Sequence, residues 1–255
     1  MNVVVCAKYV PNPNGVPELG QDNLLKREGV EGALDPGDEY GVEAGLQLAD
    51  AQGGEVTVLS MGPEPATAAV RKALSMGAHR AVLITDGSLR GADVLATAKV
   101  LAAAIKRQEF DLVIAGVEST DGYTGTLPMA LAELLEAPSV TFARKIEVSD
   151  GTLRVERQTE AGYDTVECPL PAVVTVTAGA TEPRYPTLKG IMQAKQKPVD
   201  KVTVQDLGLS EEDVKASQTV EAVNDAPEKG AGEIVEDPDE GVTKAVQLLS
   251  EAKVI

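Results

Sequence analysis

The sequence predicts an α/β protein with a doubly wound, mainly parallel sheet. Apolar runs of strand length alternate with helical patterns over the first two thirds of the chain. Such alternation implies parallel strands joined by right-handed crossovers. Of the residues, 43% are hydrophobic but only 3% are aromatic, with no Trp. The core is therefore expected to consist of Val, Leu, Ile and Ala, as in buried parallel strands.

Apolar runs predict the strands of this sheet at residues 3–7, 55–59, 81–84, 112–115 and 173–176. Between them, helical patterns cover residues 40–48, 66–74, 92–105 and 127–135. The third pattern is the clearest, because apolar residues recur at i, i+4, i+7 and i+11 from Val94 to Ile105. That spacing places them on one core-facing stripe of a helix.

The character of the chain changes after Pro138. Polar and apolar residues alternate at 139–148 and 153–159, around a Ser-Asp-Gly-Thr turn at 149–152. This pattern is typical of a β-hairpin, which would add an antiparallel flank to the sheet.

The last part of the chain loses the strand–helix rhythm from about residue 200. Residues 220–240 are rich in Glu, Asp, Pro and Gly, and such a stretch cannot bury enough apolar surface to fold alone. Residues 242–249 are typical of a short amphipathic helix. The two interpretations are a disordered acidic end and an extended arm that becomes ordered by wrapping a partner.

Composition excludes several classes of function. The chain carries 40 Asp and Glu against 23 Lys and Arg, a net charge of -17, which disfavours nucleic acid and anionic membrane surfaces as partners. No apolar run approaches the roughly 18 residues that span a bilayer, so no direct membrane insertion is expected. The N-terminus leads directly into a strand rather than into a signal peptide. The two cysteines make no redox motif, and a cytoplasmic protein is expected.

The sequence does not predict a stand-alone catalyst. Its single histidine, His79, lies in a helix-to-strand turn without a neighbouring nucleophile or metal-ligand spacing. Phosphate-binding, dinucleotide-binding, hydrolase and zinc-protease motifs are all missing. No catalytic residue and no metal site are therefore predicted.

A ligand site is predicted at the carboxyl ends of the strands, where doubly wound sheets bind their ligands. The loop at 115–125 contains glycines and hydroxyl residues and precedes a helix that starts near Thr126. Free backbone N–H groups there, joined by the hydroxyls of Ser119, Thr120 and Thr124, would form an anion cradle. Glycine would let a phosphate approach the backbone closely. The alternative is a plain glycine-rich connection.

Two further strand ends, at residues 5–8 and 59–63, face the same edge of the predicted sheet. Asp35 stands directly before Pro36, a favourable N-cap for the first helix. Its polar atoms are expected either to contact an adenine or ribose or simply to cap the helix.

Residues 185–195 form the most distinctive segment of the chain. Leu188, Ile191 and Met192 are spaced i, i+3 and i+4, which makes one apolar face of a helical turn. Lys189, Lys195 and Lys197 flank that face. A basic projection with an apolar face on so acidic a chain suggests docking into a partner. The alternative is a buried turn with incidental lysines.

These elements, in this order, resemble the beta subunit of electron transfer flavoprotein in its bacterial form. The motifs that carry the resemblance are at residues 6–11, 34–39, 71–78, 116–122, 170–174 and 182–195. The resemblance implies a fold similar to that of adenine-nucleotide alpha-hydrolase domains and a heterodimer with an alpha subunit that carries most of an FAD site. It also implies an electron carrier that accepts electrons from acyl-CoA dehydrogenases and similar flavin dehydrogenases and delivers them to a quinone oxidoreductase.

The resemblance further implies site residues and a division of the chain. A structural AMP would be bound by Cys6, Ala7, Asp35, Pro36, Gly37, Asp38, Met61, Gly116, Val117, Glu118, Ser119, Thr120, Asp121, Gly122, Tyr123 and Thr124. The partner dehydrogenase would be bound by Tyr185, Leu188, Ile191, Met192 and Lys195, with Leu188 as the anchor. The expected parts are a nucleotide-binding domain at 1–184, a partner-recognition loop at 185–199 and an arm at 200–255 that wraps the alpha subunit.

Two alternative functions stay open. In a bifurcating electron transfer flavoprotein, a second FAD would take the nucleotide site. A stand-alone nucleotide-binding domain of the stress-protein or ligase type would fold without a partner and would have no use for the Leu188 projection.

Overall fold

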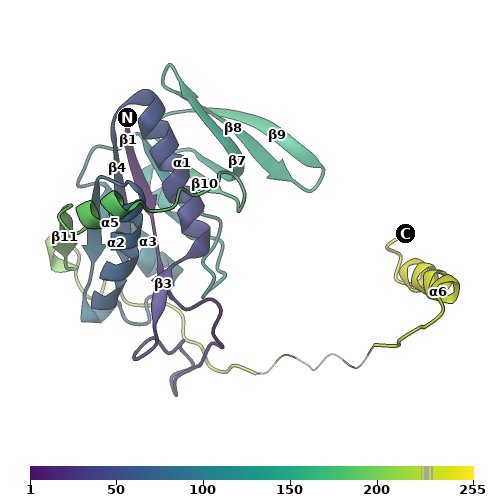
Figure 1. Ribbon diagram of the computed structural model, residues 1–255. Coiled ribbons are helices and arrows are strands. Elements are labelled where there is room, and N and C mark those ends of the chain that lie inside the picture. The colour runs from purple at the N-terminus through teal and green to yellow at the C-terminus, as the bar shows by residue number, and fades with distance from the viewer. Residues whose placement is uncertain (225, 227–229, 231) are drawn as a thin grey trace. The chain divides into compact units, whose positions relative to one another are not determined.

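The computed structural model describes residues 1–224, 226, 230 and 232–255 (Figure 1). The chain divides into two units, Met1–Glu221 and Ala222–Ile255, and each is described by itself. Five residues of the acidic stretch predicted at 220–240 lie outside the described residues.

The first unit contains a nine-stranded sheet in the order β11-β5-β4-β1-β6-β10-β7-β8-β9. Pairing is parallel from β11 to β7 and antiparallel from β7 to β9. The predicted parallel strands are confirmed within two residues at each end. They are β1 (Asn2–Cys6), β4 (Glu55–Met61), β5 (Arg80–Ile84), β6 (Leu112–Gly116) and β10 (Ala172–Val176).

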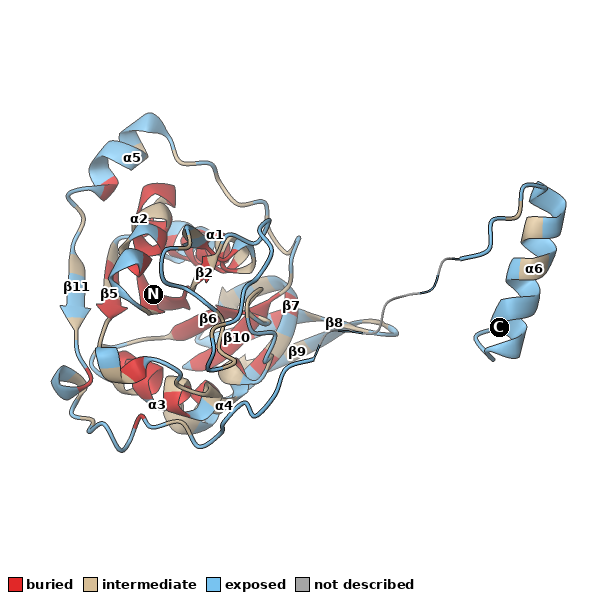
Figure 2. Ribbon diagram, turned by 90° about the horizontal axis from the view of Figure 1, so that it is seen from below, coloured by how far each residue is buried: buried red, intermediate tan, exposed pale blue. Residues whose placement is uncertain are grey.

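Helices cover both faces of the sheet, as expected of a doubly wound fold. Buried side chains of α1 (Pro36–Gln52) and α2 (Thr67–Met76) pack on one face. Those of α3 (Val94–Ile105) and α4 (Leu127–Leu135) pack on the other. Figure 2 shows the buried strands between the two helical layers. The predicted stripe of α3 is confirmed, because Ala98, Leu101 and Ile105 are buried in that second layer.

The antiparallel flank is larger than predicted. The hairpin of β7 (Ser139–Ser149) and β8 (Thr152–Thr159) is confirmed, and β9 (Gly162–Pro169) adds a third strand. Phe142 has a positive φ of 59°, and the register with β8 shifts between Ala143 and Lys145. Such a bulge bends a strand, and here it lies where β7 changes partners from β10 to β8. β9 was missed because only two of its residues, Val166 and Cys168, pack on the core.

Three short strands were also not predicted. β2 (Tyr9–Pro11) and β3 (Gly32–Leu34) form a small antiparallel sheet of their own. β11 (Val199–Val202) pairs in parallel with β5 at the sheet edge. Its two central residues are charged, as is common in edge strands, so its sequence does not differ from that of a loop. The first unit therefore continues past residue 200 and also buries Val204 and Val214.

The second unit contains α6 (Pro238–Glu251), which extends the predicted helix by four residues at its start and two at its end. Asp237 caps it by accepting hydrogen bonds from the amides of Asp239 and Glu240, both 2.9 Å. Val242, Val246 and Leu249 are exposed. None of the helices in the described parts of the chain has the length and apolarity needed to cross a membrane.

Candidate functional site

The strand order places a switch point at the carboxyl ends of β1 and β6. These strands are neighbours, yet the helices that follow them, α1 and α4, cover opposite faces of the sheet. A crevice for ligands opens at such a point in α/β proteins. The predicted nucleotide residues come together here: Cys6 ends β1, Asp35 and the first residues of α1 follow β3, and residues 116–124 begin with the last residue of β6. Met61 ends β4, the other neighbour of β1.

Asp35 connects the first helix to the loop after β6. It is fully buried, and its carboxylate caps α1 by accepting a hydrogen bond of 2.9 Å from the amide of Gly37. Its other oxygen accepts from the amide of Thr120 at 2.7 Å and from the hydroxyl of Thr120 at 2.9 Å. The predicted N-cap is therefore confirmed, and the same side chain also fixes the position of the glycine-rich loop.

Asp38 lies one turn further and is also buried. Its Oδ2 accepts a hydrogen bond of 2.7 Å from the amide of Lys8. A Cβ atom at residue 116 would lie 2.9 Å from its Oδ1, so the glycine there permits the close approach of the loop. Burial raises the pKa of Asp38 to about 8, and the nearby charge of Asp35 adds to this effect. Burial, with a smaller effect of Asp38, raises the pKa of the Cys6 thiol to about 12.

The raised pKa of Asp38 predicts a pH dependence of stability. A carboxyl that binds its proton more tightly in the folded state stabilises the fold below its unfolded pKa, near 3.8, and this contribution is lost as the pH rises towards about 8. Asp38→Asn is expected to flatten this decline, whose slope is at most about 1.4 kcal/mol per pH unit. Urea denaturation at pH 5, 7 and 9 measures it. Parallel pH profiles for the two proteins would contradict the assignment.

Two cations, Lys8 and Arg27, complete a group of polar side chains that we call the strand-end cluster. Its other members are Asp35, Asp38, Ser119, Thr120 and Asp121. The ammonium of Lys8 donates to Ser119 Oγ at 3.1 Å and to Asp121 Oδ1 at 2.7 Å, and Arg27 donates to the other carboxylate oxygen of Asp121. Only 4% of the Asp121 side chain is exposed. Burial alone would raise the pKa of Asp121, but Lys8 and Arg27 hold it below its usual range. Neither cation was among the predicted site residues. The place of Lys8, two residues after a strand, is a usable signal, whereas Arg27 lies in a loop without a pattern.

The residues of this edge fit an adenine nucleotide in their chemistry. Ser60 Oγ in β4 and Thr67 Oγ1, at the start of α2, are buried and have no hydrogen-bond partner within the described part of the chain. Buried hydroxyls without partners are costly and point to a group that is bound there. Lys8 and Arg27 supply positive charge for a phosphate, and Gly122, Tyr123 and Thr124 lie exposed in the loop. The individual contacts to a nucleotide stay predictions.

Residues 185–195, the segment predicted to dock into a partner, contain a short exposed helix. α5 (Leu188–Ala194) is capped by the hydroxyl of Thr187, which accepts from the amide of Gly190 at 3.0 Å. Exposed fractions are 89% for Tyr185, 77% for Leu188 and 64% for Met192. These values are those of a projecting apolar surface and not of a buried turn. Figure 2 shows the exposed ribbon of α5 at the edge of the first unit.

The chain that enters this helix is held by an ion pair between a half-buried arginine and a buried carboxylate. The guanidinium of Arg184 contacts Glu43 of α1 through two hydrogen bonds, from Nε to Oε2 at 2.7 Å and from a terminal nitrogen to Oε1 at 3.0 Å. Glu43 is 3% exposed. Burial alone would raise the pKa of Glu43, but the hydrogen bonds from Arg184 and Gln47 lower it. The sequence contains no signal for this pair.

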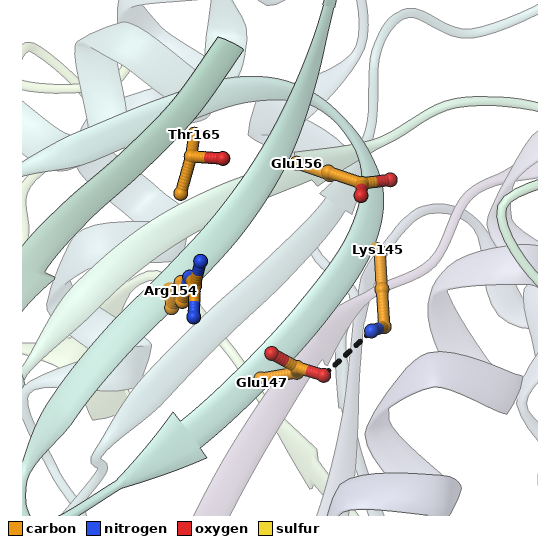
Figure 3. A pocket seen from close by; sticks show the side chains of 5 residues that line it. All are labelled: Lys145, Glu147, Arg154, Glu156 and Thr165. Atoms are coloured by element: carbon orange, nitrogen blue, oxygen red, sulfur yellow. Dashed lines mark ion pairs between the residues drawn. The ribbon is translucent and has the colours of Figure 1, made fainter. Parts of the chain in front are cut away.

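A hollow of about 300 Å³ lies on the antiparallel flank, and neither the strand-end cluster nor α5 contributes to its lining. Its lining comes from β7, β8 and β9: Lys145, Glu147, Arg154, Glu156 and Thr165 (Figure 3). The ammonium of Lys145 lies 2.6 Å from Glu147, and Arg154 lies 3.6 Å from Glu167. Because these charges neutralise each other on exposed strands, the hollow is a solvated sheet face rather than a ligand site.

Fold and site together define a doubly wound α/β protein with a strand-end cluster suited to a nucleotide and an exposed apolar helix. The electron transfer flavoprotein domain matches residues 22–207. The chain is 43% identical to the electron transfer flavoprotein subunit beta of Mycobacterium tuberculosis, covering 100% of this chain and 99% of that protein. It is 38% identical to the same subunit of Thermoanaerobacterium thermosaccharolyticum, covering 98% and 97%. It is also 39% identical to the caffeyl-CoA reductase-Etf complex subunit CarD of Acetobacterium woodii, covering 92% of each.

The chain belongs to the electron transfer flavoprotein family, as a beta-type subunit. The resemblance in the sequence is thereby confirmed. Membership makes it a subunit of an electron carrier that is associated with flavin and with an alpha subunit.

Proposed function

We propose that this chain forms a heterodimer with an alpha subunit that carries most of the FAD, and that the complex accepts electrons from acyl-CoA and related dehydrogenases. The heterodimer then delivers them to a quinone oxidoreductase. The observation that carries the proposal is α5, whose apolar side chains are exposed although its backbone is fixed to the body of the unit. A carrier needs such a surface, because it must recognise each donor and then release it.

The strand-end cluster is proposed to bind AMP in a structural role. Asp35 holds Thr120 of the loop at residues 116–124, and Asp38 accepts from the amide of Lys8. Lys8 and Arg27 bind Asp121 of the same loop. Ser60 in β4 and Thr67 at the start of α2 add hydroxyls without a partner in the described part of the chain. FAD supplies the redox chemistry when the alpha subunit is bound. This chain contributes the docking surface, the nucleotide cluster and the C-terminal arm, for which the exposed apolar face of α6 suggests wrapping of the alpha subunit.

A second candidate differs only in the nucleotide. The relative that is named for a caffeyl-CoA reductase-Etf complex favours a bifurcating system, in which a second FAD would replace AMP.

The test is co-expression with an alpha-type subunit, followed by purification and nucleotide extraction. A yellow heterodimer with one FAD and one AMP is expected. Two FAD per heterodimer would establish the bifurcating alternative. A colourless monomer that ignores the alpha subunit would refute the carrier function and favour a stand-alone nucleotide-binding domain.

A further inference from the structure

A groove of about 480 Å³ lies between α2 and α5, beside the docking helix. One wall comes from α2, where Ala68, Arg71, Lys72 and Ser75 are spaced i, i+3, i+4 and i+7. Ile191 and Lys195 line the other side. Ile191 is 46% exposed and belongs to the apolar face of α5. The groove is therefore continuous with the surface proposed to dock the electron donor.

The walls of the groove are held together by backbone contacts. A Cβ atom at Gly190 would lie 2.5 Å from the carbonyl oxygen of Ser75, so α5 rests directly on the backbone of α2. Arg71 donates to the carbonyls of Ala194 and Lys197. The ammonium of Lys197 donates in turn to three carbonyls at the end of α2, those of Leu74, Gly77 and Ala78. The shape of the groove is thus built before any partner arrives.

The groove is cationic although the chain carries a net charge of -17. Arg71, Lys72 and Lys195 line it, and no carboxylate is among its lining residues. The hydrogen bonds of Arg71 go to carbonyls, which do not neutralise its charge. Lys72 has a carboxylate only at the limit of ion pairing, with 3.9 Å between its ammonium and Glu39. The groove therefore carries positive charge beside Ile191.

We propose that this groove is the second half of the docking surface and binds a carboxylate side chain of the partner dehydrogenase. Charge complementarity identifies the occupant, because three cations beside an apolar face select an acidic residue next to an apolar pocket. Charges at the rim of an interface mainly raise the association rate and fix orientation. The groove would offset the repulsion that an acidic donor meets from the rest of the chain. This proposal rests on the proposed carrier function and adds the chemistry of the partner surface.

The test uses the co-purified heterodimer and an acyl-CoA dehydrogenase that has been reduced by its acyl-CoA substrate. Lys72→Glu and Lys195→Glu are compared with Lys99→Glu, an identical charge change on an exposed residue of α3, which covers the opposite face of the sheet. For the two groove variants, kcat/KM for flavin reduction is expected to fall about tenfold at low ionic strength. The defect should shrink to about twofold near 0.5 M salt, where the Debye length is a few ångströms.

Several results would overturn the inference. If the groove variants have the same kcat/KM as Lys99→Glu at low salt, the groove is not part of the docking surface. If Leu188→Ala still lowers kcat/KM in the same assay, the proposed function stands. Loss of FAD in the groove variants would show that the groove contacts the alpha subunit instead of the dehydrogenase. Inhibition by phosphate beyond that of chloride at equal ionic strength would assign it to a small anion. A defect confined to electron delivery to the quinone oxidoreductase would assign it to the acceptor.

Discussion

Arg184→Ala is expected to lower the free energy of unfolding by about 3 kcal/mol, because it leaves a buried carboxylate without its partner. Glu43 is 3% exposed and accepts two side-chain hydrogen bonds from Arg184. Glu43 would keep hydrogen bonds from the side-chain amide of Gln47, at 2.9 Å, and from the backbone amide of residue 184, at 3.2 Å. Neither donor carries the positive charge that compensates a buried carboxylate. Urea denaturation at neutral pH measures the change.

The matched control is Arg154→Ala. Arg154 pairs with Glu167 at 3.6 Å, but both side chains are exposed, so less than about 1 kcal/mol is expected. The pKa of Glu43 is lowered in the folded state. The ion pair therefore stabilises the fold at pH values above the ordinary pKa of a glutamate, and this contribution is lost as the pH falls. The difference between wild type and Arg184→Ala should therefore shrink in acid. Equal losses for Arg184→Ala and Arg154→Ala would contradict the role of burial.

The second large effect is expected on electron transfer. Leu188→Ala should reduce kcat/KM for flavin reduction by a dehydrogenase about 30-fold, since one apolar anchor at a transient interface contributes about 2 kcal/mol. The Leu188 side chain is 77% exposed, so its loss removes little packing within the chain. FAD content and thermal stability should stay unchanged. Stopped-flow reduction of the heterodimer, with flavin absorbance for the content, measures both.

Leu95→Ala provides the control for this experiment. Leu95 lies on α3 and is also exposed, but on the opposite face of the sheet. It should leave reduction unchanged. If Leu188→Ala loses FAD in proportion to activity, the helix acts within the heterodimer, and its assignment to docking is wrong.

Most of the central sheet was predictable because its signals are local. A buried parallel strand requires consecutive apolar residues, and a covering helix requires an apolar stripe, so each element is recognisable in its own sequence. The edge elements β9 and β11 were missed because they lack such a local signal. Each has one solvated side or charged central residues, and pairing with a neighbour makes it a strand.

The candidate site was predictable in location but not in its connections. Asp35 before a proline indicated a helix cap, and the glycine-rich loop indicated a strand-end site. That Asp35 also holds Thr120, 85 residues away, could not be read from either segment. Arg27 and Asp121, 94 residues apart, form a pair that depends on where two loops meet.

The sequence by itself determined the fold class, the family and the apolar face of residues 188–192, because hydrophobic periodicity, turn residues and helix caps act over a few positions. Only the tertiary structure decided how that face is presented. Gly190 on Ser75, Arg71 on the end of α5, and Arg184 on Glu43, 141 residues away, are contacts between distant segments. Their geometry follows from the packing of helices on the sheet, and no local pattern encodes which of the chain's many charges are buried.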